Sequence, residues 1–144
     1  MNILLDTHTF LWFVNDDSRL SQPARILIEA EETQPFLSVA SLWEIAIKIS
    51  VGKLVLKQPY ETFIPQQLAL NGIGVLNITL EHTAAIATLP FHHRDPFDRL
   101  LVAQSKGGAV LVGQGEVGCL RRRLDDCAMV AVISIEKVPA ADQR

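Results

Sequence analysis

Three acidic residues, Asp6, Glu44 and Asp98, each stand where an apolar segment gives way to a stretch with helical periodicity. They lie in LLDTHTFLW, SVASLWEIAIK and HHRDPFDRLLVAQ, which are far apart in the sequence. Carboxylate oxygens are hard ligands of the kind that Mg²⁺ or Mn²⁺ prefers. Like charges that a fold gathers at one place are stabilised by a bound cation. If the three acids meet, they form a divalent-metal site.

Short apolar runs alternate with amphipathic stretches along the chain. The expected strands are 2–5, 36–39, 75–78, 109–112 and 129–135, and the expected helices are 9–14, 22–31, 42–51, 60–70, 80–88 and 96–106. Strands separated by helices predict an α/β fold whose central, mainly parallel sheet of about five strands is flanked by helices. Ligands of such sheets bind outside the carboxyl ends of the strands, where helices begin. The three acids are expected at that edge.

Each acid also has a structural interpretation. The sequence Ser41-x-x-Glu44 before an apolar run is typical of a capping box, and Asp95 before a proline is typical of a helix cap. Asp6 could cap the helix that follows it. Glu44 and Lys48 could form a plain surface pair worth about 0.3 kcal/mol. Singly, each acid fits a cap at least as well as a ligand, whereas the combination favours a metal site.

Composition restricts the class of protein. The 144 residues are 49% hydrophobic and 20% charged, which predicts one globular domain over 1–144. A net charge of −3 argues against broad adhesion to nucleic acid, so any RNA contact needs a local patch and a bound metal. The two cysteines lack C-x-x-C spacing, which disfavours a zinc site. The start MNILLDTHTF is neither a signal peptide nor a membrane span, so a cytoplasmic protein without a membrane partner is expected.

The three segments together resemble the PIN-domain ribonucleases, in particular the VapC-like toxins of bacterial type II toxin–antitoxin pairs. The resemblance covers residues 1 to 112 and is most specific in HHRDPFDRLLVAQ. It implies a single PIN-like domain, a metal-dependent endoribonuclease that hydrolyses RNA, a homodimer, and inhibition by a cognate antitoxin. Asp6, Glu44 and Asp98 match the family's first three acidic positions, and are therefore the expected catalytic residues and ligands of Mg²⁺ or Mn²⁺.

Beyond the fourth expected strand the chain departs from the family. The family's Thr/Ser-x-Asp turn is replaced by LVGQGEVGCLRRRLDDC, with Gly113 at the hydroxyl position and Gly115 at the position of the fourth acid. Residues 113–128 therefore leave the pattern, and 137–144 form a polar tail. Glu116, one residue further on, is an accessory candidate. A weakly occupied metal site and reduced activity are expected.

Thr7 and Asp95 are the other accessory candidates. Thr7 could orient Asp6, contact phosphate or cap the helix, and His8 could lie at the rim of the site. The aromatic residues Trp12, Trp43 and Phe97 are interpreted as core or dimer-interface side chains rather than as base-stacking platforms.

Two other functional classes compete with the ribonuclease hypothesis. One is a phosphoaspartyl hydrolase, because a strand ending in Asp-Thr resembles the start of the D-x-D-x-T pattern, although His8 stands where the second aspartate belongs. The other is a catalytically weakened or inactive PIN-like module that binds RNA or protein. The departure from the family pattern at Gly115 is the reason for this hypothesis.

Overall fold

A computed structural model of the chain describes residues 2–89, 95–105, 110–113 and 133–134. Its five-stranded sheet has the order β3-β2-β1-β4-β5, and every neighbouring pair is parallel. The strands are β1 (Asn2–Leu5), β2 (Gln34–Ser38), β3 (Gly74–Leu76), β4 (Val110–Gly113) and β5 (Ile133–Ser134). The predicted α/β fold with a mainly parallel sheet of this size is confirmed.

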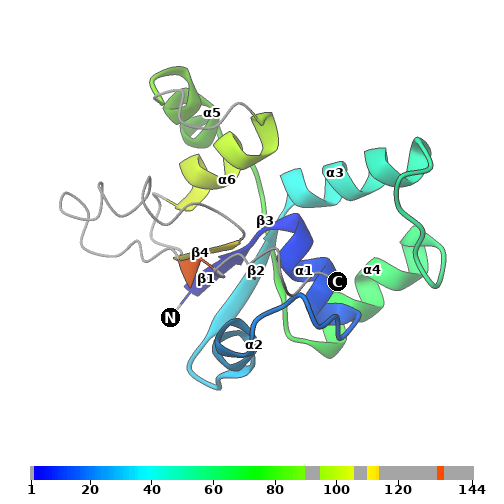
Figure 1. The fold of residues 1–144 in the computed structure, drawn as a ribbon. Helices are drawn as coiled ribbons and strands as arrows, with labels where there is room; N and C mark the ends of the chain where they lie inside the picture. Colours follow the sequence, from blue (N-terminus) through cyan, green and yellow to red (C-terminus); the bar gives the residue numbers. More distant parts are fainter. Residues whose placement is uncertain (1, 90–94, 106–109, 114–132, 135–144) are drawn as a thin grey trace, which may run out of the picture.

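Helices connect the strands and cover both faces of the sheet. They are α1 (Thr7–Val14), α2 (Gln22–Glu29), α3 (Val39–Ser50), α4 (Tyr60–Leu70), α5 (Leu80–Ala87) and α6 (Pro96–Ser105). Figure 1 shows α1, α3 and α4 on one side of the sheet and the α5–α6 pair on the other. No helix among the described residues is long and apolar enough to cross a membrane.

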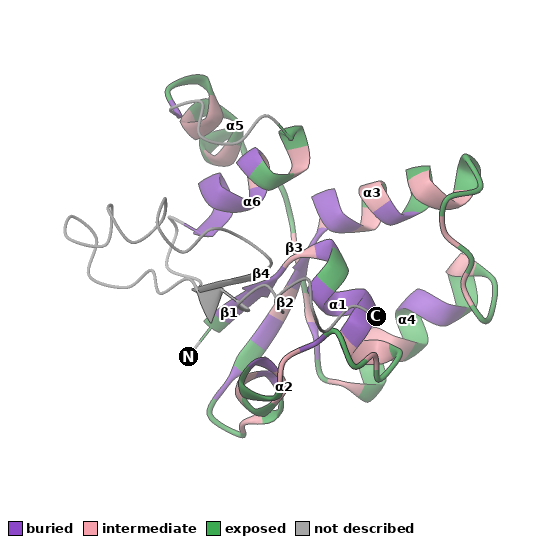
Figure 2. Cartoon of the chain, viewed as in Figure 1, coloured by how far each residue is buried: buried purple, intermediate pink, exposed green. Residues whose placement is uncertain are grey.

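The central strand β1 is buried on both sides, as a strand between two helical layers must be. Ile3 and Leu5 pack into the cluster formed with α1, α2, α3 and α4, whereas Leu4 points the other way and packs with Leu101 and Val102 of α6. The side chains of Ile3, Leu4 and Leu5 have no exposed surface. Figure 2 shows how the buried residues line the sheet and the helix faces turned toward it. The strand that ends at Asp6 is therefore rigidly held.

Two helices begin earlier than the sequence pattern predicted, because their caps lie further upstream. The carboxylate of Asp6 accepts a hydrogen bond from the Thr9 backbone N–H at 2.7 Å, so α1 starts at Thr7 and not at residue 9. The hydroxyl of Ser38 accepts one from the Ala40 N–H at 3.0 Å, so α3 starts at Val39. The interpretation of Ser41 as the cap of this helix is wrong.

We expect the Phe10→Ala substitution to lower the free energy of unfolding by about 3–5 kcal/mol, because it removes a large buried side chain and leaves a cavity. Phe10 is fully buried in the cluster between β1 and the helices. Urea denaturation measures the change. The control is Ile26→Ala, at a side chain of α2 that is 60% exposed, and its cost should stay within about 0.5 kcal/mol. Equal losses in both variants would contradict the observed packing of α1.

Candidate metal centre at the carboxyl edge of the sheet

Asp6 follows β1 directly and lies at the carboxyl edge of the sheet. Its side chain is half-buried, and its Oδ1 accepts the hydrogen bond that caps α1. The cap interpretation of Asp6 is therefore confirmed. This hydrogen bond fixes the direction of the carboxylate.

Glu44 reaches from α3 to the first turn of α1. Its Oε2 accepts a hydrogen bond from the Thr7 hydroxyl at 2.6 Å, and its Oε1 lies 3.0 Å from Nζ of Lys48. Thr7 is 2% exposed and Glu44 is half-buried, so this hydrogen bond joins the two helices at a partly buried position. Since α3 begins at Val39, Glu44 lies beyond the first turn, and the expected capping box with Ser41 does not form. The carboxylate of Glu44 therefore accepts a hydrogen bond from another helix and does not cap its own helix.

The Lys48–Glu44 pair is the expected (i, i+4) pair, but it is more enclosed than a plain surface pair. The side chains retain 29% and 15% of their exposed surface, respectively. A partly enclosed carboxylate with both oxygens engaged is stabilised mainly by a nearby positive charge. Here the Lys48 ammonium supplies that charge at the place where a ligand carboxylate would meet a cation.

Asp98 lies in the first turn of α6, and Asp95 caps that helix. Oδ1 of Asp95 accepts hydrogen bonds from the backbone N–H groups of Phe97 at 2.8 Å and of Asp98 at 3.2 Å. The cap interpretation of Asp95 is confirmed, so Asp98 does not carry that role. The Phe97 ring meets the Trp43 ring of α3 edge to face, with centroids 5.4 Å apart. Each ring precedes an acid in sequence, so this contact brings the turns that carry Asp98 and Glu44 alongside each other.

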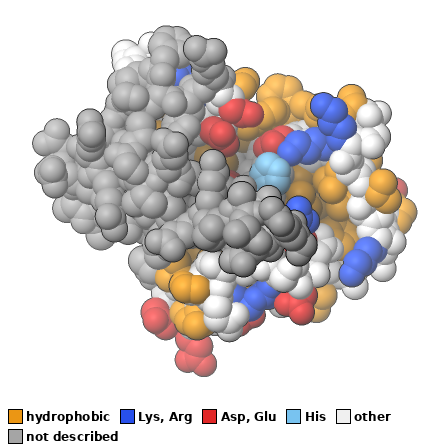
Figure 3. Space-filling model, viewed as in Figure 1, with side chains coloured by type: hydrophobic (Ala, Val, Ile, Leu, Met, Phe, Trp, Pro, Cys, Tyr) orange, Lys and Arg blue, Asp and Glu red, His pale blue; other side chains and the backbone are white. Residues whose placement is uncertain are grey.

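Within the described ranges, no three His, Cys, Asp or Glu side chains lie close enough together to hold a metal ion. The structure thus joins Glu44 to the start of α1 beside Asp6 and places the α6 turn with Asp98 next to α3, without closing the three carboxylates into a cluster. Figure 3 shows acidic side chains on this face beside a histidine and basic side chains. The chemistry of the donor set, three carboxylates, suits a hard divalent cation. Glu116 lies outside the described residues.

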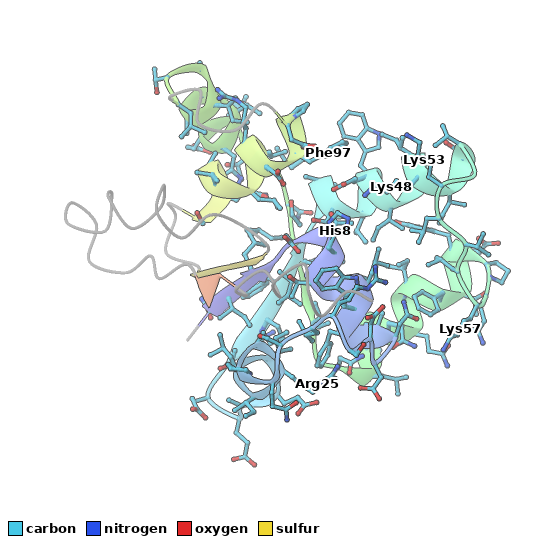
Figure 4. The ribbon with its side chains drawn as sticks, viewed as in Figure 1. His8, Arg25, Lys48, Lys53, Lys57 and Phe97 are labelled. Carbon is cyan, nitrogen blue, oxygen red and sulfur yellow. The ribbon has the colours of Figure 1, made fainter. Side chains whose placement is uncertain are left out.

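The rim of the site carries His8 and the aromatic residues. His8 is exposed, and its ring centroid lies 6.0 Å from that of Trp12 (Figure 4). Trp12 is 7% exposed, which confirms its assignment to the core. Trp43 is 61% exposed, so of its two predicted roles, core or dimer interface, the core is excluded and the dimer interface stays a prediction. Ala40, Ser41 and Ile45 form the buried side of α3, and Trp43 lies on the exposed side, as does Ile47 four positions on.

Sequence reasoning misses the partner of Thr7. The sequence suggests Asp6, a phosphate or a helix end as its contact, whereas its hydroxyl donates to Glu44, 37 positions away. No short-range pattern contains such a pair, because it depends on how α1 and α3 pack. The local signal is weak, because α1 has two buried polar side chains, Thr7 and Thr9, and nothing in the sequence tells which of them has a distant partner.

A matched pair of substitutions in α1 tests this hydrogen bond. Thr7→Val removes the donor to Glu44 and should lower the free energy of unfolding by about 1–3 kcal/mol, since the acceptor is charged. Thr9→Val, two positions along, should be neutral or stabilising by up to about 1 kcal/mol, because Oγ1 of Thr9 is buried and accepts or donates no hydrogen bond within the described structure. Thermal and urea unfolding measure both. A larger loss for Thr9→Val than for Thr7→Val would refute this arrangement.

The sequence of the chain matches a known family and a known protein. Residues 3–111 match the sequence model of the PIN domain. The chain is 33% identical over 60 residues to Ribonuclease VapC16 of Mycobacterium tuberculosis, an alignment that covers 42% of this chain and 43% of that protein. The alignment thus spans less than half the length of that relative.

Solved structures share the fold. A chain from the crystal structure of VapBC2 of Rickettsia felis bound to a promoter DNA fragment superposes with a TM-score of 0.62 at 14% identity, covering 92% of this chain and 98% of that chain. A chain from a toxin–antitoxin complex of Klebsiella pneumoniae gives a TM-score of 0.55 at 15% identity, covering 92% and 99%. With the sequence match over residues 3–111 and the parallel sheet whose edge carries Asp6 and Glu44, this chain belongs to the PIN domain family.

Proposed function

We propose that this protein is an endoribonuclease that depends on Mg²⁺ or Mn²⁺, with Asp6, Glu44 and Asp98 as its metal ligands and catalytic residues. The observation that carries this proposal is the position of Glu44, held by Thr7 at 2.6 Å against the helix that Asp6 starts, with Lys48 as its counterion. Membership of the PIN domain family and the similarity to a protein named a ribonuclease support it.

The residues at this edge have separate tasks in such a reaction. A bound divalent cation would supply an activated water and neutralise charge on the scissile phosphodiester. Asp6 is oriented by its cap hydrogen bond, and Glu44 by the Thr7 hydroxyl, so both carboxylates are fixed before any ligand binds. The Lys48 ammonium can turn from Glu44 toward a substrate phosphate once another cation balances the acid.

We further propose that three acids suffice for the site. The family's fourth acidic position is Gly115, and Glu116 is offset by one residue, in a segment outside the described structure. A site with three ligands holds its cation less tightly than a site with four, so reduced activity accompanies this proposal. Asp95 is proposed only as the cap that orients α6, and Thr7 as the residue that positions Glu44.

The proposed biological role is that of a toxin in a type II toxin–antitoxin pair. The Klebsiella pneumoniae structure is a toxin–antitoxin complex, and the fold of a chain in it is shared by this protein. An edge with several carboxylates attracts arginine or lysine side chains, so a cognate antitoxin with a basic segment is the proposed partner. We also propose that the protein is a homodimer in which residues 1–144 of each chain form a single domain. It acts on RNA in the cytoplasm.

One alternative has its own support. The three carboxylates do not close into a metal cluster in the described structure, which favours a weakened or inactive PIN-like module that binds RNA or protein without cleaving. Metal-dependent cleavage distinguishes the two functions.

The first test is cleavage of a mixed RNA pool. We expect cleavage with Mg²⁺ or Mn²⁺ and none in EDTA, and we expect Asp6→Asn, Glu44→Gln and Asp98→Asn to lower the rate by about 100-fold or more, since each removes a charge that stabilises the metal and the transition state. Gel electrophoresis of labelled RNA measures the rates.

The variants allow folding and chemistry to be separated. Asparagine caps helices as well as aspartate does, so Asp6→Asn should keep α1 intact. Glu29→Gln, at an exposed acid at the end of α2, is the charge-matched control and should cleave at the wild-type rate. Cleavage that continues in EDTA, or that survives all three substitutions at the site, excludes the metal-dependent mechanism and the assigned ligands.

The second test concerns Lys48. An entering cation competes with the Lys48 ammonium for Glu44, so Lys48→Met should tighten Mn²⁺ binding by about fivefold, the equivalent of about 1 kcal/mol for a partly exposed pair. Calorimetric titration measures the affinity. Lys53→Met removes the same charge at an exposed position beyond α3 and should stay within about twofold of wild type. Weaker Mn²⁺ binding by Lys48→Met than by Lys53→Met would show that the two cations do not compete.

A further inference from the structure

We propose that the exposed indole of Trp43, buttressed by Phe97, is a stacking platform for a base of single-stranded RNA beside the scissile phosphate. This inference rests on the proposed ribonuclease function and adds the class of its substrate. It departs from the expectation that both rings serve the core or a dimer interface.

The position of the pair supports this assignment. Trp43 immediately precedes Glu44, and Phe97 immediately precedes Asp98, so the two rings extend from the same helical turns as two of the three proposed ligands. Their centroids are 5.4 Å apart at an interplanar angle of 73°, which fixes the indole while leaving 61% of the residue exposed. A large aromatic side chain that is held but uncovered can stack on a base with little loss of conformational entropy.

An apolar strip continues from Trp43 along α3. Ile47 and Val51 follow at intervals of four residues, so they lie on the same side of the helix, and they are 37% and 59% exposed. Lysines flank the strip: Lys48 lies in α3, and Lys53 follows the end of the helix (Figure 4). Apolar contacts for bases, with lysines beside them for phosphates, complement an unpaired strand.

The geometry also selects single strands over duplexes. In a duplex the bases are stacked on one another and their faces are closed to an indole, whereas unpaired bases can be splayed onto an aromatic side chain. With a net charge of −3 the whole chain has no broad attraction for duplex backbones. Recognition by a few stacked bases and local lysines is consistent with this negative net charge.

The experiment uses intrinsic fluorescence, because the chain has two tryptophans and Trp12 is buried at 7% exposure. Full-length protein in EDTA, which prevents metal-dependent cleavage, is titrated with a short oligouridylate and with the matching duplex. We expect saturable quenching by the single strand only. Trp43→Leu should lose the quenching and bind about tenfold more weakly by anisotropy of labelled RNA, a typical loss for one stacked base.

Two further variants separate stacking from folding. Trp43→Tyr keeps an aromatic face and should retain binding within about threefold of wild type. Ile26→Ala alters a side chain of nearly equal exposure, 60%, on α2, and should bind as wild type does. Melting temperatures of all variants should agree within about 4 °C, since an exposed substitution changes stability little.

Several results would overturn the platform: no binding of the oligouridylate by wild type, equal affinity in Trp43→Leu, or equal quenching by the duplex. A dimer that dissociates in Trp43→Leu while RNA affinity stays unchanged would assign the strip to a protein partner instead, and also overturns it. The platform and the nuclease can fail separately. Binding that depends on Trp43, in a protein that never cleaves RNA with Mg²⁺ or Mn²⁺, supports the platform and refutes the proposed activity.

Discussion

The carboxylate of Asp6 stands at the junction on which this edge of the molecule depends. β1 is buried between two helical layers and cannot shift, and Asp6 ends it by accepting the Thr9 N–H at 2.7 Å. With that hydrogen bond α1 begins at Thr7, so that Asp6 is the single residue between β1 and α1. As a result, the hydroxyl of Thr7 points toward α3, where it donates to Glu44. One cap therefore sets both the direction of its own carboxylate and the position of a second.

An ion pair within α3 balances the charge of Glu44. Glu44 is enclosed enough that its charge needs compensation, and Lys48 provides it one helical turn away at 3.0 Å. Asp98 belongs to a different layer, on α6, whose first turn lies beside α3 where the Phe97 and Trp43 rings pack against each other. The three acids thus belong to three different elements of the fold.

Short-range sequence patterns predicted the structure correctly where the contact that determines it joins residues close in sequence. The alternation of apolar runs and amphipathic stretches predicted the parallel sheet, and Asp95 caps α6 as expected because it accepts hydrogen bonds from backbone N–H groups within three residues. The pattern failed at α3, where Ser38 and Ser41 are both acceptable caps. The choice between them depends on where β2 ends, which is set by its pairing with β1 and β3.

The sequence by itself determined the family, the α/β architecture and the residue types at the carboxyl edge, because the periodicity of apolar residues and the three acidic segments are properties of short stretches. Only the tertiary structure decided that Thr7 donates to Glu44, and that Trp43 lies outside while Trp12 lies in the core. The physical reason is that helical periodicity places Trp43 relative to its neighbours on α3, whereas the rotation of α3 about its axis is fixed by packing against α1 and α6.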